Sequence, residues 1–380
     1  MKPSNPITPS DNGALHLLGR IEAAFQKAGI STCYQSVGEI IATDEDSAAF
    51  IREVLTDSEY TSPQEDSPIY QFAKSRAQHS VLTFFVGLVF LEFCDFEQMI
   101  ARDVLKSEDR ADVVRLWMLT ALYHDWGYHS EDVSDPDLDY AKIVKYPLLT
   151  DAYEEEWLHP IRDFSLGHQH ILAYTYDEIM TYDRYARDYH AGNNSDKEKV
   201  DHGILGGVKI FDRLAKRIRK DVPEARADST EKRLCFAKIA CLTIAQHNIF
   251  KSSSAESDLR YGDALKKLHS TSDFRINMDT PLLLLLSLVD TFECIKRFGQ
   301  SKNERAYLQK NTILQSIALE VSPDSITIDY TALAGKIQDK DDSLRDCFNG
   351  YKRGICGIGS WTAFAAERVS EERIVIQLKA

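Results

Sequence analysis

The sequence predicts a mainly α protein: a large helical bundle followed by a small α+β appendage at the C-terminal end. Apolar residues recur at helical spacing through most of the 380 residues, with no alternation of strands and helices of the βαβ kind. The sequence contains neither a G-x-G-x-x-G motif nor a P-loop, so it carries no common signature of a nucleotide-binding parallel sheet. Strand-like alternation begins only near residue 312.

The first predicted helices follow a polar N-terminal tail. Residues 1–12 are polar and contain prolines, so we expect a flexible tail there, and helical spacing then predicts a helix over 14–28. Asp44 or Asp46 is suited to cap a second helix that runs through Leu55. Longer helical patterns follow, over residues 69–101, 108–125, 166–189, 200–220, 230–249 and 280–298.

Two polar stretches interrupt the helical patterns. Residues 130–165 are acidic and contain proline, and residues 190–199 are rich in turn-forming residues. We therefore expect an insertion over about 130–199 within a helical domain that spans residues 13–304.

The C-terminal region, residues 305–380, has a different pattern. Residues 316–321 and 326–330 alternate between apolar and polar side chains, and Ser-Pro-Asp-Ser separates them. This arrangement predicts a β-hairpin, and the alternation over 373–378 predicts a further strand. We therefore expect a small α+β region to close the chain.

Composition and charge argue against several classes of protein. The net charge of −14 repels phosphate backbones, so nucleic acid is a disfavoured partner. The longest apolar stretch, Val81–Phe93, is shorter than the about 20 residues that span a bilayer. The N-terminal segment lacks the apolar core of a signal peptide, and the seven cysteines include no C-x-x-C pair. These features predict a cytoplasmic protein with reduced thiols and no membrane partner.

Histidines and aspartates stand at telling positions in the most apolar helical patterns. An imidazole or an ionised carboxylate in such a setting is unfavourable unless it is paired or bound to a cation. Four imidazoles and two carboxylates suit divalent transition metals such as Mn, Fe, Ni, Co or Zn. We therefore expect convergence on metal of the following residues: His79, His124, Asp125, His202, His247 and Asp290.

The order H…HD…H…H…D over roughly residues 68–300 resembles that of the HD-domain metal-dependent phosphohydrolase superfamily. The segments His202-Gly-Ile-Leu-Gly206 and Asp290-Thr-Phe292 are similar to those of two-metal members, which include the HD-GYP cyclic-dinucleotide phosphodiesterases. The GYP sequence itself is absent after His247. The resemblance implies that the helical bundle is an HD domain.

The resemblance also implies how the ligands are shared between two metals. Asp125 would bridge the two ions, and His202 and His247 would complete the second site. The family often has a paired histidine where Asn248 stands, and His168 or His170 is an alternative ligand in place of His247. The first metal would be held by His79, His124, Asp125 and Asp290.

The chemistry that the resemblance implies is hydrolysis of a phosphoester by a hydroxide that bridges the two metals. Arg76, one helical turn before His79, is a candidate phosphate contact, and His129 is a candidate general acid. Tyr128 stands where many family members have a phosphate-binding lysine. Lys209 begins a basic cluster suited to guiding a phosphorylated substrate. The expected substrate is a small phosphorylated molecule, with a nucleotide favoured.

Three other functions stay open on the same residues. HD-domain di-iron oxygenases that resemble myo-inositol oxygenase use the same six ligand types. An HD nuclease and an inactive HD sensor or scaffold are less favoured. Self-association into a homo-oligomer is compatible with all of them.

Overall fold

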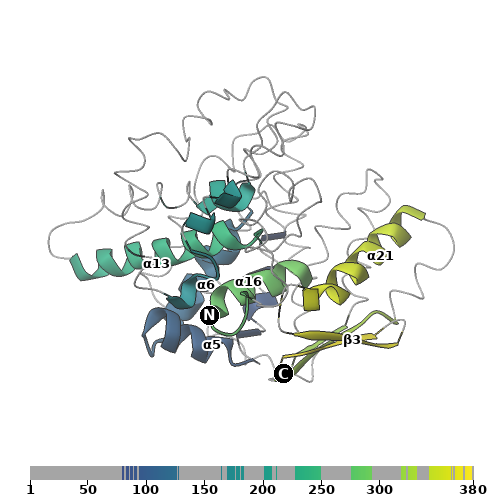
Figure 1. Ribbon diagram of the computed structural model, residues 1–380. Coiled ribbons are helices and arrows are strands. Elements are labelled where there is room, and N and C mark those ends of the chain that lie inside the picture. The colour runs from purple at the N-terminus through teal and green to yellow at the C-terminus, as the bar shows by residue number, and fades with distance from the viewer. Residues whose placement is uncertain are drawn as a thin grey trace, which may run out of the picture. The chain divides into compact units, whose positions relative to one another are not determined.

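The computed structural model is mainly helical with one small sheet in the residues that it describes, which confirms the predicted mainly α fold class (Figure 1). The chain divides into two compact units, a first unit of residues 1–97 with 288–380 and a second unit of residues 98–287. The described residues are 79–80, 83–84, 86–88, 90–91, 94–125, 127, 164, 169–175, 177–179, 181–183, 201–207, 211, 227–249, 275–292, 318–321, 324–331, 342–360, 362, 364–370 and 373–378.

Two long helices form the framework of the second unit. α6 (Arg110–Tyr123) and α13 (Ala227–Gln246) contact each other. Most of α6 is buried on every side, as its apolar sequence predicts. Asp109 caps α6, because its carboxylate accepts a hydrogen bond from the backbone N–H of Ala111 at 2.9 Å. The helix predicted over 108–125 is therefore confirmed with slightly shorter bounds.

A buried carboxylate links the first turn of α6 to α13. Asp112 is 1% exposed, and its Oδ2 lies 2.6 Å from Nζ of Lys232 on α13. The hydroxyl of Ser107 donates to the same oxygen at 2.9 Å, and Nη1 of Arg115 lies 3.3 Å from Oδ1. A buried carboxylate needs such partners, so the pairing holds these two helices together at this end.

The prediction of one continuous helix over 166–189 is wrong. A 3-10 turn, η4 (Gln169–Ile171), precedes a bend, and helical structure resumes only among the described residues from 177 to 183. Gln246 explains the break: its Oε1 accepts from the N–H groups of Ala173 and Tyr174 at 3.0 and 3.2 Å, and its Nε2 donates to the carbonyl of Ile171 at 3.1 Å. One side chain thus satisfies backbone groups that a continuous helix would pair internally.

The predicted helix over 69–101 is also interrupted. Its described residues from 79 to 91 are helical, a bend follows at residues 94–95, and α5 (Phe96–Met99) and the π-helix η2 (Ile100–Leu105) come next. On a continuous helix, Phe90 and Phe96 would diverge by about 120°. The bend lets both rings pack together at a centroid distance of 6.5 Å in the core of the first unit.

α16 (Pro281–Phe292) is the most apolar helix described, and it confirms the helix predicted from residue 280. Its leucine side chains from 282 to 286 are almost wholly buried. Residues 281–287 of this helix belong to the second unit and residues 288–292 to the first. Among the described helices, none has both the length and the apolar character needed to cross a membrane.

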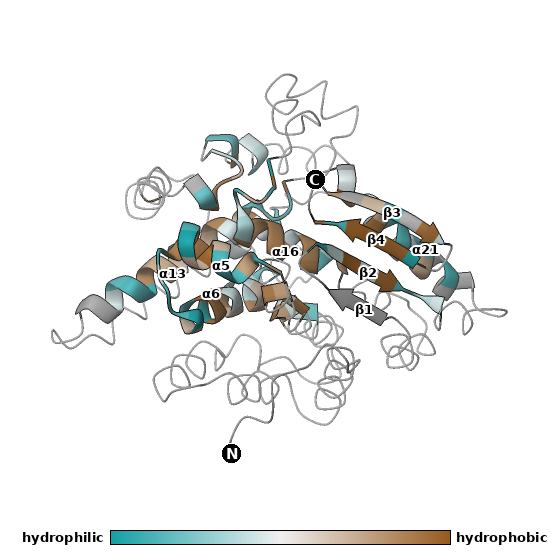
Figure 2. Cartoon of the chain, turned by 90° about the horizontal axis from the view of Figure 1, so that it is seen from below, coloured by the Kyte–Doolittle hydropathy of each residue, from teal (hydrophilic) through white to brown (hydrophobic). Residues whose placement is uncertain are grey.

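The sheet of the first unit has four antiparallel strands in the order β1-β2-β4-β3. β1 (Ala318–Val321) and β2 (Ser325–Asp329) form the predicted hairpin, and β4 (Arg373–Gln377) is the predicted third strand. β3 (Ala365–Ser370) pairs with β4 at the edge and was not predicted. Figure 2 shows many apolar residues on β2 and β4, which are the inner strands.

A helix that the sequence analysis did not predict, α21 (Asp342–Cys356), packs on this sheet. Tyr330, which directly follows β2, is fully buried, and its ring meets the rings of Phe348 and Tyr351 edge to face at 5.5 and 5.9 Å. The hydroxyl of Tyr351 donates to the carbonyl of Phe292 at 2.9 Å. These contacts anchor α21 within the first unit.

Candidate metal centre

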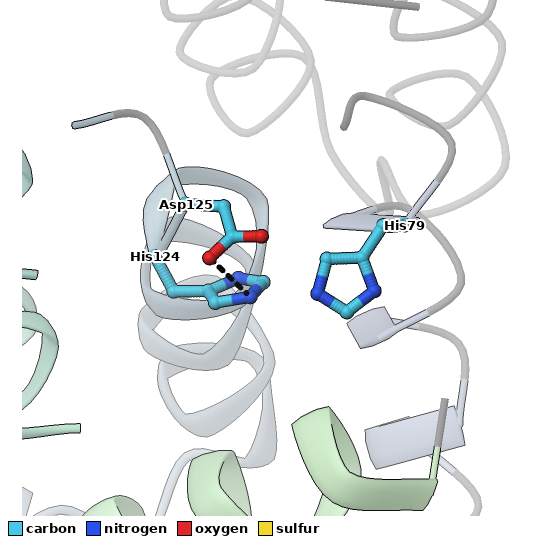
Figure 3. A group of neighbouring side chains, drawn as sticks. All are labelled: His79, His124 and Asp125. Carbon is cyan, nitrogen blue, oxygen red and sulfur yellow. Dashed lines mark ion pairs between the residues drawn. The ribbon is translucent and has the colours of Figure 1, made fainter. Parts of the chain in front are cut away.

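His124 and Asp125 stand at the C-terminal end of α6, as the apolar run before them predicts (Figure 3). Both side chains are buried, at 0% and 2% exposed. His124 Nδ1 lies 2.8 Å from the carbonyl oxygen of Ala121, one turn back along the helix. Because that carbonyl can only accept, Nδ1 carries the proton, and Nε2 is the nitrogen that faces Asp125 Oδ1, at 3.4 Å.

His247 repeats this arrangement at the end of α13. Its Nδ1 lies 2.7 Å from the carbonyl oxygen of Ile244, again three residues earlier, and the side chain is fully buried. Its Nε2 faces Asp125 Oδ1 at 3.9 Å. Histidines that ligate metals usually donate their other ring N–H to a carbonyl or carboxylate, which fixes the tautomer and orients the ring. Both histidines therefore have the orientation that metal ligands need.

His202 comes from the start of a short described helix, over residues 202–207. Asp201 caps this helix, because its Oδ1 accepts from the N–H groups of Gly203 and Ile204 at 2.9 and 3.2 Å. Nε2 of His202 lies 3.5 Å from Asp125 Oδ1. The cap thus places the first helical residue, His202, beside the end of α6.

Glycines allow the end of α6, the helix over residues 202–207 and α13 to approach one another closely. A Cβ atom on Gly127 would lie 1.9 Å from the carbonyl oxygen of His202, and one on Gly207 would lie 2.6 Å from that of Cys241 in α13. A Cβ atom on Gly203 would lie 2.9 Å from Nδ1 of His247. The first two contacts are with backbone atoms and the third is with a buried histidine ring, so none of these positions has room for a side chain. The Gly-rich sequence after His202 is therefore a packing feature of the site.

One buried cluster of four side chains surrounds Oδ1 of Asp125. Its members are His124, Asp125, His202 and His247. The donor atoms of Asp125, His202 and His247 all lie within 4.8 Å of one another. The rings of His124 and His202 lie 5.4 and 5.2 Å from that of His247. Two ligands on one transition-metal ion lie about 3.0–4.2 Å apart when each bond is about 2.1 Å. The nitrogen–oxygen distances of 3.4, 3.5 and 3.9 Å fall in that range, so the cluster can hold a metal ion.

The two remaining predicted ligands belong to the first unit and pair with each other. His79 (labelled in Figure 3) is fully buried in a helical segment, and its Nε2 lies 2.9 Å from Oδ1 of Asp290. Asp290 lies in α16 and is 14% exposed. A histidine and an aspartate thus meet here in an apolar setting, as the sequence predicts. Their sharing of one centre with the other four ligands stays a prediction.

Two contributors to the cluster were not predicted from the sequence. Asp201 acts as the helix cap, and Asn248 places its amide nitrogen 2.7 Å from Nε2 of His202. Asp201 directly precedes a predicted ligand and a glycine, which is a typical capping sequence. For Asn248 the sequence offered one signal only, namely that it stands where the family that the chain resembles often has a histidine.

The other predicted site residues cannot be placed in the same way. His170 is exposed, and its Nδ1 lies 3.1 Å from the carbonyl oxygen of Asp279, which sets it apart from the buried cluster. The following lie outside the described residues: Arg76, Tyr128, His129, His168 and Lys209.

No protein-family model, curated protein or solved structure matches this chain. The function is therefore inferred from the cluster itself.

Proposed function

We propose that the protein is a metal-dependent phosphohydrolase of the HD-domain type, acting on a nucleotide or another small phosphoester. The observation that carries the proposal is the set of three buried histidines whose Nε2 atoms face one oxygen of Asp125. Imidazole nitrogens with a shared carboxylate favour a divalent transition metal over Mg²⁺ or Ca²⁺, which prefer oxygen ligands.

The proposed centre holds two such ions. Asp125 would contribute its carboxylate to both ions, since it lies among candidate ligands that come from three segments. The two ions, when bound, would lower the pKa of a coordinated water and neutralise charge on the phosphoryl oxygens. The proposed ligands are His79, His124, Asp125 and Asp290 for the first ion, and Asp125, His202 and His247 for the second.

The chain's own groups have distinct tasks in this proposal. The buried cluster keeps bulk water away from the ligands, and the Nδ1–H bonds of His124 and His247 hold the two rings in position. Arg76 contacts the phosphate, and His129 protonates the leaving oxygen. Tyr128 donates a hydrogen bond to the substrate, and Lys209 guides it by charge.

Cleavage of bis(p-nitrophenyl) phosphate with added Mn²⁺ or Ni²⁺ tests this function. The purified full-length protein should release p-nitrophenol, and Asp125→Asn should lose about 100-fold or more of that activity with its metal. Asp177→Asn is the matched control, because it makes the same change at an exposed position and should behave like the wild type.

Two results would contradict the proposal in different ways. Anaerobically purified protein that holds two irons, consumes O₂ and cleaves no phosphoester would favour the di-iron oxygenase. The nitrogen-rich ligand set is also suited to iron, which is why this alternative is kept. A folded protein that binds no metal at all would favour a sensor or scaffold.

A further inference from the structure

Gln246, the last residue of α13, directly precedes the candidate ligand His247 and is fully buried. Its side chain binds the backbone of residues 171–174, here called the strap: Oε1 accepts from two N–H groups of the strap, and Nε2 donates to one strap carbonyl and to the carbonyl of Leu242 at 2.8 Å. An amide oxygen accepts two hydrogen bonds and an amide NH₂ group donates two. These four hydrogen bonds, the Gln246 clamp, therefore use the whole capacity of the side chain.

His247 lies just beyond the regular part of α13, in a turn over residues 247–249. Its N–H donates to the carbonyl of Ile244 at 3.3 Å, and the N–H of Ile249 donates to the carbonyl of Gln246 at 3.0 Å. Helix ends fray in the absence of tertiary contacts. Because the clamp fixes the last helical residue against the strap, it also steadies the turn that carries His247.

A second contact joins the same turn to the chain beyond the strap. The hydroxyl of Tyr182 donates to the backbone carbonyl of Asn248 at 3.3 Å. Thr175 and Glu178 begin the helical segment that carries Tyr182, since the N–H of Thr175 donates to Oε2 of Glu178 at 2.9 Å and the N–H of Glu178 donates back to Oγ1 of Thr175 at 3.3 Å. The residues before and after the candidate ligand are thus both tied to this part of the chain.

We propose that Gln246 is a positioning residue that couples the strap to the metal centre. Order in the strap favours metal binding at His247, and metal binding at His247 orders the strap. Coupling of this kind is reciprocal and typically amounts to about 5- to 150-fold in affinity. The inference rests on the proposed function in one respect, namely that the cluster binds metal through His247.

Hydrogen–deuterium exchange of the full-length protein measures one direction of the coupling. The N–H groups of Ala173 and Tyr174 exchange only when the clamp opens. Free Co²⁺ at 100 times its Kd makes any opening that releases the ion about 100-fold rarer. We therefore expect these two amides to exchange at least about 10-fold more slowly with Co²⁺ than in the metal-free protein. Amides of β3 and β4, which belong to the other unit, are the internal control and should change much less.

Co²⁺ titration of Gln246→Leu measures the other direction, because the visible absorption of Co²⁺ reports its binding. Leucine can neither accept nor donate, so the clamp is lost. We expect Co²⁺ to bind about 10-fold or more weakly and to lose most of its effect on the exchange of the strap. A merely structural role of Gln246 would speed exchange equally with and without Co²⁺ and would leave the slowing by Co²⁺ intact.

Two further variants complete the test. Gln98→Leu is the matched control, because it makes the same change at an exposed position of α5, and it should behave like the wild type. Tyr182→Phe removes one hydroxyl from the second contact and serves if Gln246→Leu disturbs folding. We expect it to bind Co²⁺ about 2- to 10-fold more weakly, which corresponds to one net hydrogen bond.

Three outcomes would overturn the inference, and they are distinguishable. Strap amides that exchange equally with and without bound Co²⁺ in the wild type would mean that the two sites are not coupled, while the proposed metal centre would stand. Unchanged Co²⁺ affinity in both Gln246→Leu and Tyr182→Phe would mean that these contacts do not position His247. A wild-type protein that takes up no Co²⁺ would overturn the metal centre together with the coupling.

Discussion

Replacing Gly127 with alanine should disrupt the cluster, because among the glycines of the described residues it is the one whose added Cβ would lie nearest to another atom. The added Cβ would lie 1.9 Å from the carbonyl oxygen and 2.6 Å from the carbonyl carbon of His202, and 2.8 Å from the backbone nitrogen of Gly206. Ordinary van der Waals contact begins at 3.4 Å, so the helix that carries His202 must move by about 1.5 Å (3.4 minus 1.9). All three contacts are with backbone atoms, which no rotamer change can relieve.

The size of the effect follows from that displacement. Overpacking in a close-packed interior destabilises by about 1–3 kcal/mol, and backbone contact places Gly127→Ala at the upper end. At about 2.1 cal/mol/K per residue, the 380 residues give an unfolding entropy of about 0.8 kcal/mol/K, so about 3 kcal/mol lowers Tm by roughly 4 °C. A shift of about 1.5 Å also moves Nε2 of His202 out of ligand geometry, so we expect the second metal ion to bind at least about 10-fold more weakly.

Differential scanning calorimetry and Co²⁺ titration measure the two effects. Gly350→Ala is the matched control, because the added Cβ in α21 would meet only the guanidinium of Arg353, at 3.9 Å. Alanine in a helix is favoured over glycine, so this control should keep or slightly raise Tm. A Gly127→Ala protein with unchanged Tm and unchanged metal binding would refute the close approach of the two segments.

Three further predictions concern other parts of the chain. Burial raises the pKa of Cys94 to about 12, so at pH 8 iodoacetamide should modify the exposed Cys356 and leave Cys94 intact. Peptide mass spectrometry measures this, and rapid modification of both cysteines would contradict the burial of Cys94. Hydrogen bonds from Thr331 lower the pKa of Asp329, so this carboxylate stabilises the fold above about pH 4, and its contribution is lost as the pH falls. The Tm values of the wild type and Asp329→Asn should therefore converge at acidic pH. A difference in Tm that stays constant with pH would refute this. Gln246→Leu should speed amide hydrogen exchange in the segment after η4, while unchanged exchange would show that the side chain does not hold it.

The sequence was sufficient for elements whose pattern is long or strongly apolar. α6 could be predicted because its apolar run is bounded by Asp109 at one end and by His124 and Asp125 at the other. The hairpin of β1 and β2 has both alternation and a turn sequence, which together specify its register. Local sequence is informative where the local signal and the tertiary structure agree.

Other features depend on contacts that local sequence does not encode. The break after η4 is made by Gln246, a residue some 70 positions away, and nothing between residues 166 and 189 indicates it. β3 was missed because its residues gain their strand form by pairing with β4 at the sheet edge.

Part of the candidate site could likewise be predicted from the sequence, and part of it could not. Buried histidines and aspartates in apolar helices are visible in a sequence because their placement is unfavourable without a partner. The approach of His202 to α6 depends on the absence of a side chain at Gly127, and its approach to the end of α13, where Asn248 lies, depends on the absence of one at Gly203. Such relations between segments appear only in three dimensions.

The metal content of the full-length protein, purified without oxygen and measured by mass spectrometry, tests the central claim most directly. We expect about two divalent transition-metal ions per chain in the wild type, and none or nearly none in Asp125→Asn, with the same helical circular dichroism. Wild-type protein that is folded, exposed to Mn²⁺, Fe²⁺, Co²⁺, Ni²⁺ and Zn²⁺, and still free of bound metal would contradict it.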